Sequence, residues 1–150
     1  MVKYERLIFV CTGNTCRGPM AEVIFRSLDT ASEIEVMSRG LVVLFPEPSN
    51  PKADTVLRNH NLTIGDHTSR ALEQEDLDED TLVLTMTQEQ KEKIIRDFVD
   101  VPNVYTLKEY VGEDGDVSDP YGKTLTDYEE CYVELARLIK KTVYKLNEEE

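Results

Sequence analysis

The sequence lacks a long apolar run and is poor in positive charge. Its longest early apolar stretch, residues 7–10, is far too short for the core of a signal peptide or for a membrane-spanning helix. Lys and Arg total 17 against 30 Asp and Glu, and the formal net charge of -13 argues against nucleic acid or an anionic membrane as a partner. We therefore expect a cytoplasmic protein in which any anion-binding site is a local exception.

Cysteine is also scarce, with only Cys11, Cys16 and Cys131. An odd number, two of them five positions apart, does not indicate a secreted disulfide framework, so reduced thiols are expected. No second pair of Cys or His residues stands at ligand spacing, and His60 and His67 are isolated. We therefore expect no metal site.

Apolar runs of strand length alternate with segments of helical spacing along the 150 residues, a length that suits one domain over residues 1–150. The patterns predict strands at residues 6–10, 34–38, 81–86 and 104–107. They predict helices at 19–28, 51 to about 61, 87–98, and from about 127 to an acidic tail at 148–150. This alternation implies an α/β fold with a parallel sheet covered by helices on both faces.

The segment VCTGNTCRGP, residues 10–19, leaves the first predicted strand at the sheet edge where ligands bind in such folds. Gly13 and Asn14 tolerate a positive φ, so successive backbone N–H groups can form an anion-binding nest. The N-terminus of the next helix adds its positive end, and the same field favours the thiolate of Cys11. Arg17 can bind two phosphoryl oxygens at once. Cys11 and Arg17 together predict phosphoryl transfer to sulfur.

Other interpretations of this loop fit less well. No GK[ST] follows, which excludes a Walker loop, and the absence of G-x-G-x-x-G excludes a dinucleotide fingerprint. A buried cysteine that merely ends a strand would require neither Gly13 nor Arg17.

Phosphoryl transfer also needs an acid for the leaving group, and the candidate is Asp119 in the segment SDPYG. By itself D-P-Y-G is a good turn sequence. Its place after the fourth predicted strand brings the turn to the same sheet edge as Cys11, where it could hold Asp119 and Tyr121 over the nest.

These motifs together resemble the low-molecular-weight protein tyrosine phosphatase family. The likeness covers C-x5-R after the first strand, SRG at residues 38–40, HTSR at residues 67–70 and D-P-Y before the last helix. It implies a four-stranded parallel sheet, a cysteinyl-phosphate intermediate at Cys11, anion binding by Arg17 and Asp119 as general acid. It further implies phosphorylated protein substrates, a phosphate or similar oxyanion in the loop, and no metal or organic cofactor. We expect a monomer.

The resemblance also assigns supporting residues. Contacts to phosphate or substrate fall to Thr12, Gly13, Asn14, Thr15, Cys16, Gly18 and Tyr121, and the loop is braced by Asn14, Ser38 and His67. Cys16 either forms a reversible disulfide with Cys11 under oxidation or is a packed thiol. Cys131, on the apolar face of the last helix, is expected in the core.

Within the family, the chain most resembles bacterial members that act on phosphoarginine in proteins. They share Thr15, where phosphotyrosine enzymes usually carry a bulkier aliphatic residue, Gly122, where many carry a second aromatic, and LKEYV at residues 107–111. The small hydroxyl side chain of Thr15 suits a guanidinium better than a phenyl ring, and Asp119 can pair with that cation. We expect a protein arginine phosphatase, with a tyrosine phosphatase on the same scaffold as the alternative. Arsenate reductases of this fold need further cysteines after the third strand, and none appears there.

One residue departs from the family pattern. The position after the arginine normally carries Ser or Thr, whose hydroxyl helps to hold the cysteine as thiolate, and here it is Gly18. Loss of one hydrogen bond to an anion typically costs about 1.5 to 3 kcal/mol. The change leaves open a slower enzyme or a phosphoprotein-binding module without chemistry, although the presence of Cys11, Arg17 and Asp119 argues against the module.

Overall fold

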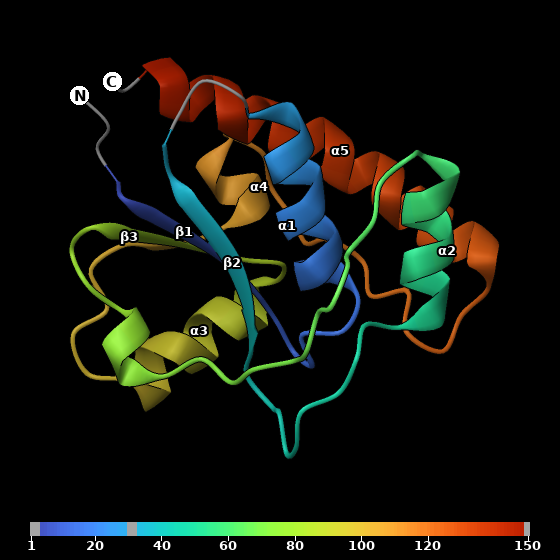
Figure 1. Ribbon diagram of the computed structural model, residues 1–150. Helices are drawn as coiled ribbons and strands as arrows, with labels where there is room; N and C mark the ends of the chain where they lie inside the picture. The colour runs from blue at the N-terminus through green and yellow to red at the C-terminus, as the bar shows by residue number, and fades with distance from the viewer. Residues whose placement is uncertain (1–3, 30–32, 149–150) are drawn as a thin grey trace.

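The computed structural model describes residues 4–29 and 33–148 and contains a parallel sheet flanked by helices (Figure 1). Its strands in the described residues are β1 (Arg6–Cys11), β2 (Glu35–Gly40), β3 (Thr81–Thr85) and β4 (Val104–Thr106). They pair in the order β2-β1-β3-β4, and every pairing is parallel. The predicted α/β fold with a four-stranded parallel sheet is confirmed.

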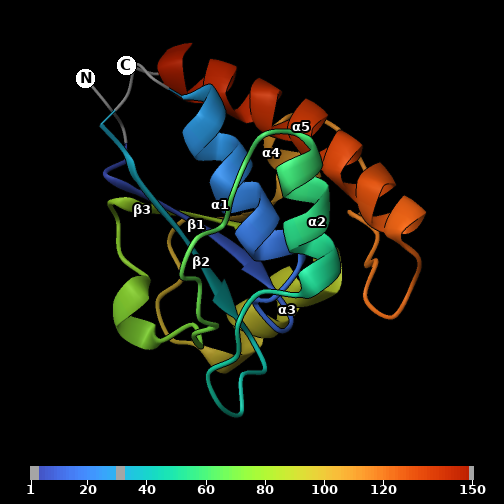
Figure 2. The same ribbon diagram turned by 45° about the vertical axis from the view of Figure 1, so that its right-hand side comes forward.

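Helices cover both faces of this sheet. They are α1 (Arg17–Leu28), α2 (Pro51–Asn59), α3 (Gln88–Asp97), α4 (Leu107–Tyr110) and α5 (Leu125–Glu148), with a short 3-10 helix at Gln74–Asp76. Figures 1 and 2 show α1, α2 and α5 on one side of the sheet and α3 on the other. None of the helices in the described ranges is long and apolar enough to cross a membrane.

Strand β1 supplies the core on both faces because its side chains alternate. Leu7 and Phe9 pack with the apolar sides of α1, α2 and α5, and Cys11 belongs to the same cluster. Ile8 and Val10 join the smaller cluster under α3. With both faces covered, β1 reads as a continuous apolar run, which is why it could be found from the sequence.

Several boundaries differ from those predicted. Strand β2 lies at 35–40 rather than 34–38, β3 and β4 each end one residue early, and α2 ends at Asn59. Helix α3 covers 88–97, α5 begins at Leu125, and the last two residues of the acidic tail lie outside the described residues. Helix α1 begins at Arg17, two residues before the predicted start, because a proline is tolerated in the first turn of a helix.

The small helix α4 was not predicted, although a signal for it exists. Thr106 accepts a hydrogen bond from the backbone N–H of Glu109, and the Glu109 side chain accepts one from the N–H of Thr106. This reciprocal capping box is readable in TLKE at residues 106–109.

Gly40, at the end of β2, sets how closely the loop after β1 approaches the sheet. It pairs with Cys11, and a Cβ placed on it would lie 2.9 Å from the carbonyl oxygen of Thr12 and 3.0 Å from Cβ of Asn14. Only a residue without a side chain fits between the strand end and this backbone.

We expect Gly40→Ala to lower the free energy of unfolding by about 1 to 3 kcal/mol, as overpacking of a tight site usually does. Gly13→Ala is the matched control, since its Cβ would meet only the Thr15 hydroxyl at 3.8 Å. Urea unfolding of both variants measures the difference, and equal midpoints would contradict the packing argument.

Candidate active site

The loop between β1 and α1 and the turn at Asp119 border a cavity of about 250 Å³ at the carboxyl edge of the sheet. Its lining is formed by Cys11, Thr12, Gly13, Thr15, Cys16, Arg17, Glu47, Asp119 and Tyr121. The structure therefore brings most of the predicted site residues together around one space. Asn14 in the loop and Gly18 in the first turn of α1 are buried.

The sulfur of Cys11 lies buried at the base of this loop and accepts a hydrogen bond from the backbone N–H of Asn14 at 3.3 Å. Burial is the largest influence on this thiol and raises its pKa above the ordinary value, whereas Arg17 and the N–H groups of Gly18 and Asn14 lower the pKa. The groups expected to favour the thiolate are thus in place. The net direction is nevertheless opposite to the one expected from the loop alone, because desolvation of the sulfur outweighs them.

Arg17 connects the loop to the turn that carries Asp119. Its guanidinium is buried, donates to the carbonyl oxygen of Val117 at 2.8 Å and lies 3.7 Å from a carboxylate oxygen of Asp119. The N–H of Val117 in turn donates to the carbonyl of Met86, just after β3. Helix α4 intervenes between β4 and this turn, so the turn is held at the sheet edge through Met86 rather than by β4 directly.

Asp119 is positioned by its own turn. Its side chain accepts a hydrogen bond from the N–H of Tyr121 at 3.0 Å, the pattern of an Asx turn. The Asp119 side chain is 53% exposed, and the ring of Tyr121 is exposed at the mouth of the cavity. A carboxylate so placed can exchange protons with solvent and with a group bound over Cys11.

Asn14 braces the loop from below. Its backbone has a φ of 59°, and its side-chain amide donates to the Ser38 hydroxyl at 2.9 Å and accepts from the N–H of Arg70 at 2.9 Å. Ser38 donates onward to Glu22 at 2.9 Å, and a ring nitrogen of His67 lies 2.7 Å from the Asn14 carbonyl oxygen. These contacts fix a left-handed residue in the middle of the nest, which fits the bracing roles expected for Asn14, Ser38 and His67.

All three cysteines are free thiols in the structure. Cys16 lies 3.4 Å from the hydroxyl of Tyr128 on α5, and burial raises the pKa of the Cys16 thiol. Cys131 is buried in the core, where burial raises its pKa to about 12. Both thiols are therefore buried packing groups in this structure, and Cys131 lies in the core as expected.

Two residues near the site escaped the sequence analysis. The Gln90 side chain on α3 donates to the Thr12 hydroxyl at 3.1 Å, and Glu47 lines the cavity from the loop after β2. Gln90 also forms the capping box at the start of α3 with Thr87, and that local role is the only one its sequence position indicates. Glu47 stands in a Pro-rich loop whose sequence carries no signal of contact with Cys11.

The arrangement contains no candidate metal centre. Within residues 4–29 and 33–148, no group of three or more His, Cys, Asp or Glu side chains is placed to hold a metal ion. The cavity lining offers the thiols of Cys11 and Cys16, the guanidinium of Arg17, hydroxyl groups, and the carboxylates of Glu47 and Asp119.

A cysteine and an arginine in an anion-binding loop, faced by a carboxylate, define a cysteine-dependent phosphatase. The chain belongs to the low molecular weight phosphotyrosine protein phosphatase family, whose sequence model matches residues 6–150. It is 38% identical over 136 residues to the low molecular weight protein-tyrosine-phosphatase PtpB of Staphylococcus haemolyticus, covering 91% of this chain and 96% of that protein. It is 37% identical over 148 residues to the protein-arginine-phosphatase of Bacillus subtilis, covering 95% and 97%.

A solved structure points to the same class. A mutant of the YwlE arginine phosphatase with a phosphorylated active-site serine matches with a TM-score of 0.90 and 36% identity, covering 95% of each chain. The protein is therefore a cysteine-based protein phosphatase, a hydrolase, and the family favours this function over a binding module without chemistry.

Gly18 offers a direct test of what stabilises the thiolate. A Cβ at this position would lie 3.1 Å from the sulfur of Cys11, so a serine hydroxyl there could reach the sulfur once its neighbours shift by a few tenths of an ångström. We expect Gly18→Ser to lower the pKa of Cys11 by about one to two units. The pH dependence of iodoacetamide alkylation, with the modified cysteine identified by peptide mass, measures the shift.

Gly18→Ala is the control for this experiment, because it adds the same Cβ without the hydroxyl. A shift of equal size in both variants would show that crowding of the sulfur, and not a hydrogen bond, changes its ionisation.

Proposed function

We propose that this phosphatase hydrolyses phosphoarginine in proteins through a cysteinyl-phosphate intermediate on Cys11. The observation that supports this substrate is a set of oxygen-bearing side chains in the cavity lining, since Thr12, Thr15 and Asp119 stand there with the thiol of Cys11. A phenyl ring would require an apolar wall, whereas a guanidinium is matched by hydroxyl and carboxylate oxygens.

Thr15 occupies a fixed place in this wall. Its carbonyl oxygen accepts a hydrogen bond from the N–H of Asn50 at 2.8 Å, and Asn50 caps the N-terminus of α2. The side chain of Thr15 is therefore presented to the cavity by backbone anchored at both the loop and α2. A change of its volume alters the cavity rather than the loop path.

In the proposed reaction, Cys11 attacks phosphorus and the P–N bond of phosphoarginine breaks. Asp119 gives its proton to the departing guanidine nitrogen, and the phosphoryl group remains on sulfur. Water then attacks the cysteinyl phosphate, Asp119 takes a proton from that water, and the S–P bond breaks to release inorganic phosphate and the thiolate. Arg17 and the loop N–H groups stabilise the charge on the phosphoryl oxygens in both steps.

Phosphotyrosine is the second candidate substrate, because the exposed ring of Tyr121 at the cavity mouth could stack on a phenyl ring. The same ring could equally cover a guanidinium. The names of the relatives include both activities, so the choice rests on the cavity wall.

The proposal also covers the compartment, the oligomeric state and the domain organisation. A thiol nucleophile needs a reducing compartment, so we place the enzyme in the cytoplasm. We propose that it acts as a monomer, with one catalytic domain over residues 1–150.

Thr15→Ile tests the substrate assignment. The change adds apolar bulk and removes a hydroxyl, and we expect it to lower kcat/KM for phosphoarginine peptides by about 10- to 200-fold while preserving or raising it for phosphotyrosine peptides. Thr15→Val separates the two effects, because it removes the hydroxyl at nearly constant volume. A wild type that prefers phosphotyrosine, or equal losses on both substrates, would defeat the phosphoarginine proposal.

Asp119→Asn tests the acid. Asparagine can still accept the hydrogen bond from the N–H of Tyr121, so the turn should survive while the transferable proton is lost. We expect aryl phosphates with poor leaving groups to slow by roughly 100-fold or more and those with good leaving groups far less. The measurement is kcat across a series of aryl phosphates, with Cys11→Ser as the inactive blank. A uniform loss would reduce Asp119 to a turn residue.

A further inference from the structure

A second carboxylate stands at the cavity that binds the phosphoryl group. Glu47 lies on the loop between β2 and α2 and lines the same cavity as Cys11, Arg17 and Asp119. An acidic side chain beside an anion-binding loop is unfavourable for the phosphoryl group itself. Its presence there calls for a cation carried by the rest of the substrate.

The backbone of Glu47 is held firmly in place. Its N–H donates to the hydroxyl of Ser69 at 2.8 Å, and the N–H of Ser69 donates to the carbonyl of Glu47 at 2.7 Å. Ser69 is buried. Pro48, the residue that follows Glu47, forms a β-bridge with Thr68. The position from which the Glu47 side chain reaches the cavity is therefore set by the fold.

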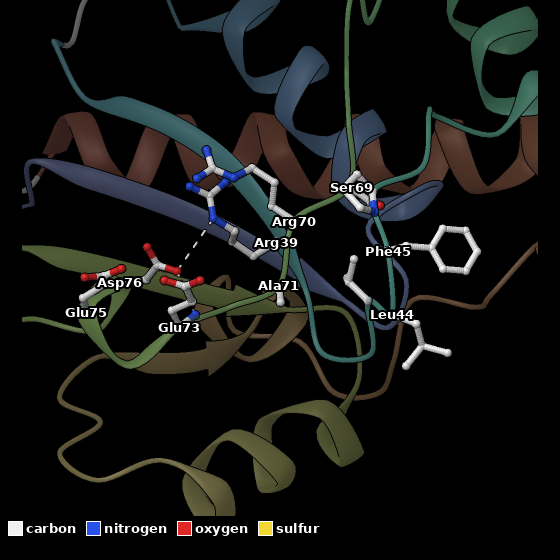
Figure 3. Close-up of a pocket in the computed structure, with 11 residues that line it drawn as sticks. Arg39, Leu44, Phe45, Ser69, Arg70, Ala71, Glu73, Glu75 and Asp76 are labelled. Atoms are coloured by element: carbon white, nitrogen blue, oxygen red, sulfur yellow. Dashed lines mark hydrogen bonds and ion pairs between the residues drawn. The ribbon is translucent and has the colours of Figure 1, made fainter.

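A second cavity also borders the loop between β2 and α2. Figure 3 shows its lining, which includes Leu44, Phe45 and Ser69, and the ion pair between Arg39 and Asp76 at 3.7 Å. No thiol lines this second cavity, so we place the reaction at the cavity of Cys11.

The carboxylate of Glu47 is exposed and is not engaged by the protein. Within the described part of the chain, it makes no hydrogen bond or ion pair, whereas Glu22 pairs with Arg26 and Asp119 lies near Arg17. Glu47 can therefore pair with a bound cation without first breaking an internal contact.

Asp119 cannot fill this role throughout the reaction. As the proposed general acid it must carry a proton before the P–N bond breaks, and in that form it lacks the charge to attract a guanidinium. A second carboxylate that takes no part in the proton transfer removes this conflict. Glu47 comes from a different loop than Asp119, so the two can approach the substrate from separate parts of the cavity wall.

We propose that Glu47 is a specificity-determining residue, whose carboxylate pairs with the guanidinium of phosphoarginine at the mouth of the cavity. This inference rests on the proposed function, because it requires a cationic group directly behind the phosphoryl group. It assigns to Glu47 a contribution to substrate binding and none to the transfer of protons.

The test compares Glu47→Gln with the wild type on two peptides that differ only in carrying phosphoarginine or phosphotyrosine and have neutral flanking residues. We expect the ratio of kcat/KM for phosphoarginine to that for phosphotyrosine to fall about five-fold, the upper end for an exposed ion pair, mainly through KM for phosphoarginine. Glu47→Lys should lower the ratio again by a similar factor. Added salt should lower the wild-type ratio but leave that of Glu47→Gln unchanged.

Glu5→Gln is the matched control. Glu5 is exposed just before β1, at the opposite edge of the sheet from the cavity, and the variant changes the net charge by the same amount. Its ratio should equal that of the wild type. A fall as large as that of Glu47→Gln would show an effect of overall charge and overturn the inference.

The outcomes separate this inference from the proposed function. A wild type that does not hydrolyse phosphoarginine peptides would refute the proposed function. If the wild type prefers phosphoarginine peptides, but the kcat/KM ratio of Glu47→Lys stays within two-fold of the wild-type ratio, only the role of Glu47 is refuted.

Discussion

The buried guanidinium of Arg17 holds together the two loops from which the site is built. One nitrogen donates to the carbonyl of Val117, and another lies near the carboxylate of Asp119, so the nest after β1 and the turn before α5 share a single cation. Because Val117 is also tied to Met86, the pair is anchored to the end of β3. The distance between the thiol and the carboxylate is thus fixed by a side chain that can also bind the phosphoryl group.

The electrostatics of the site also depend on a small number of groups. The protein carries a formal charge of -13, yet its site depends on one guanidinium, backbone N–H groups and the start of a helix rather than on a basic surface. Such groups act over short distances, so the site can attract a phosphoryl group locally while the surface repels polyanions. Burial of Cys11 opposes the same groups, and at Gly18 the chain lacks the hydroxyl that the family resemblance led us to expect after Arg17.

Much of the fold could be predicted from the sequence because apolar periodicity and caps are local signals. The continuous apolar run of β1 and the capping box of Thr87 and Gln90 at the start of α3 are both readable in the sequence, and the C-x5-R segment identified the loop. Other features need three dimensions. The sequence does not show that a Pro-rich loop brings Glu47 to the cavity, nor that α4 separates β4 from the Asp119 turn, nor that desolvation outweighs the field around Cys11.

Helix α1 begins at the site without a side-chain cap. Its N-cap position is Cys16, whose side chain makes no capping hydrogen bond and instead lies against Tyr128. The first turn of a helix has N–H groups that need acceptors, and an oxyanion in the loop can provide them. A bound oxyanion then serves as the N-terminal cap of α1, because it accepts hydrogen bonds from the first turn of this helix. Inorganic phosphate, the product, should accordingly act as a folding ligand, so the thermal stability of the protein is coupled to the phosphate concentration of its surroundings.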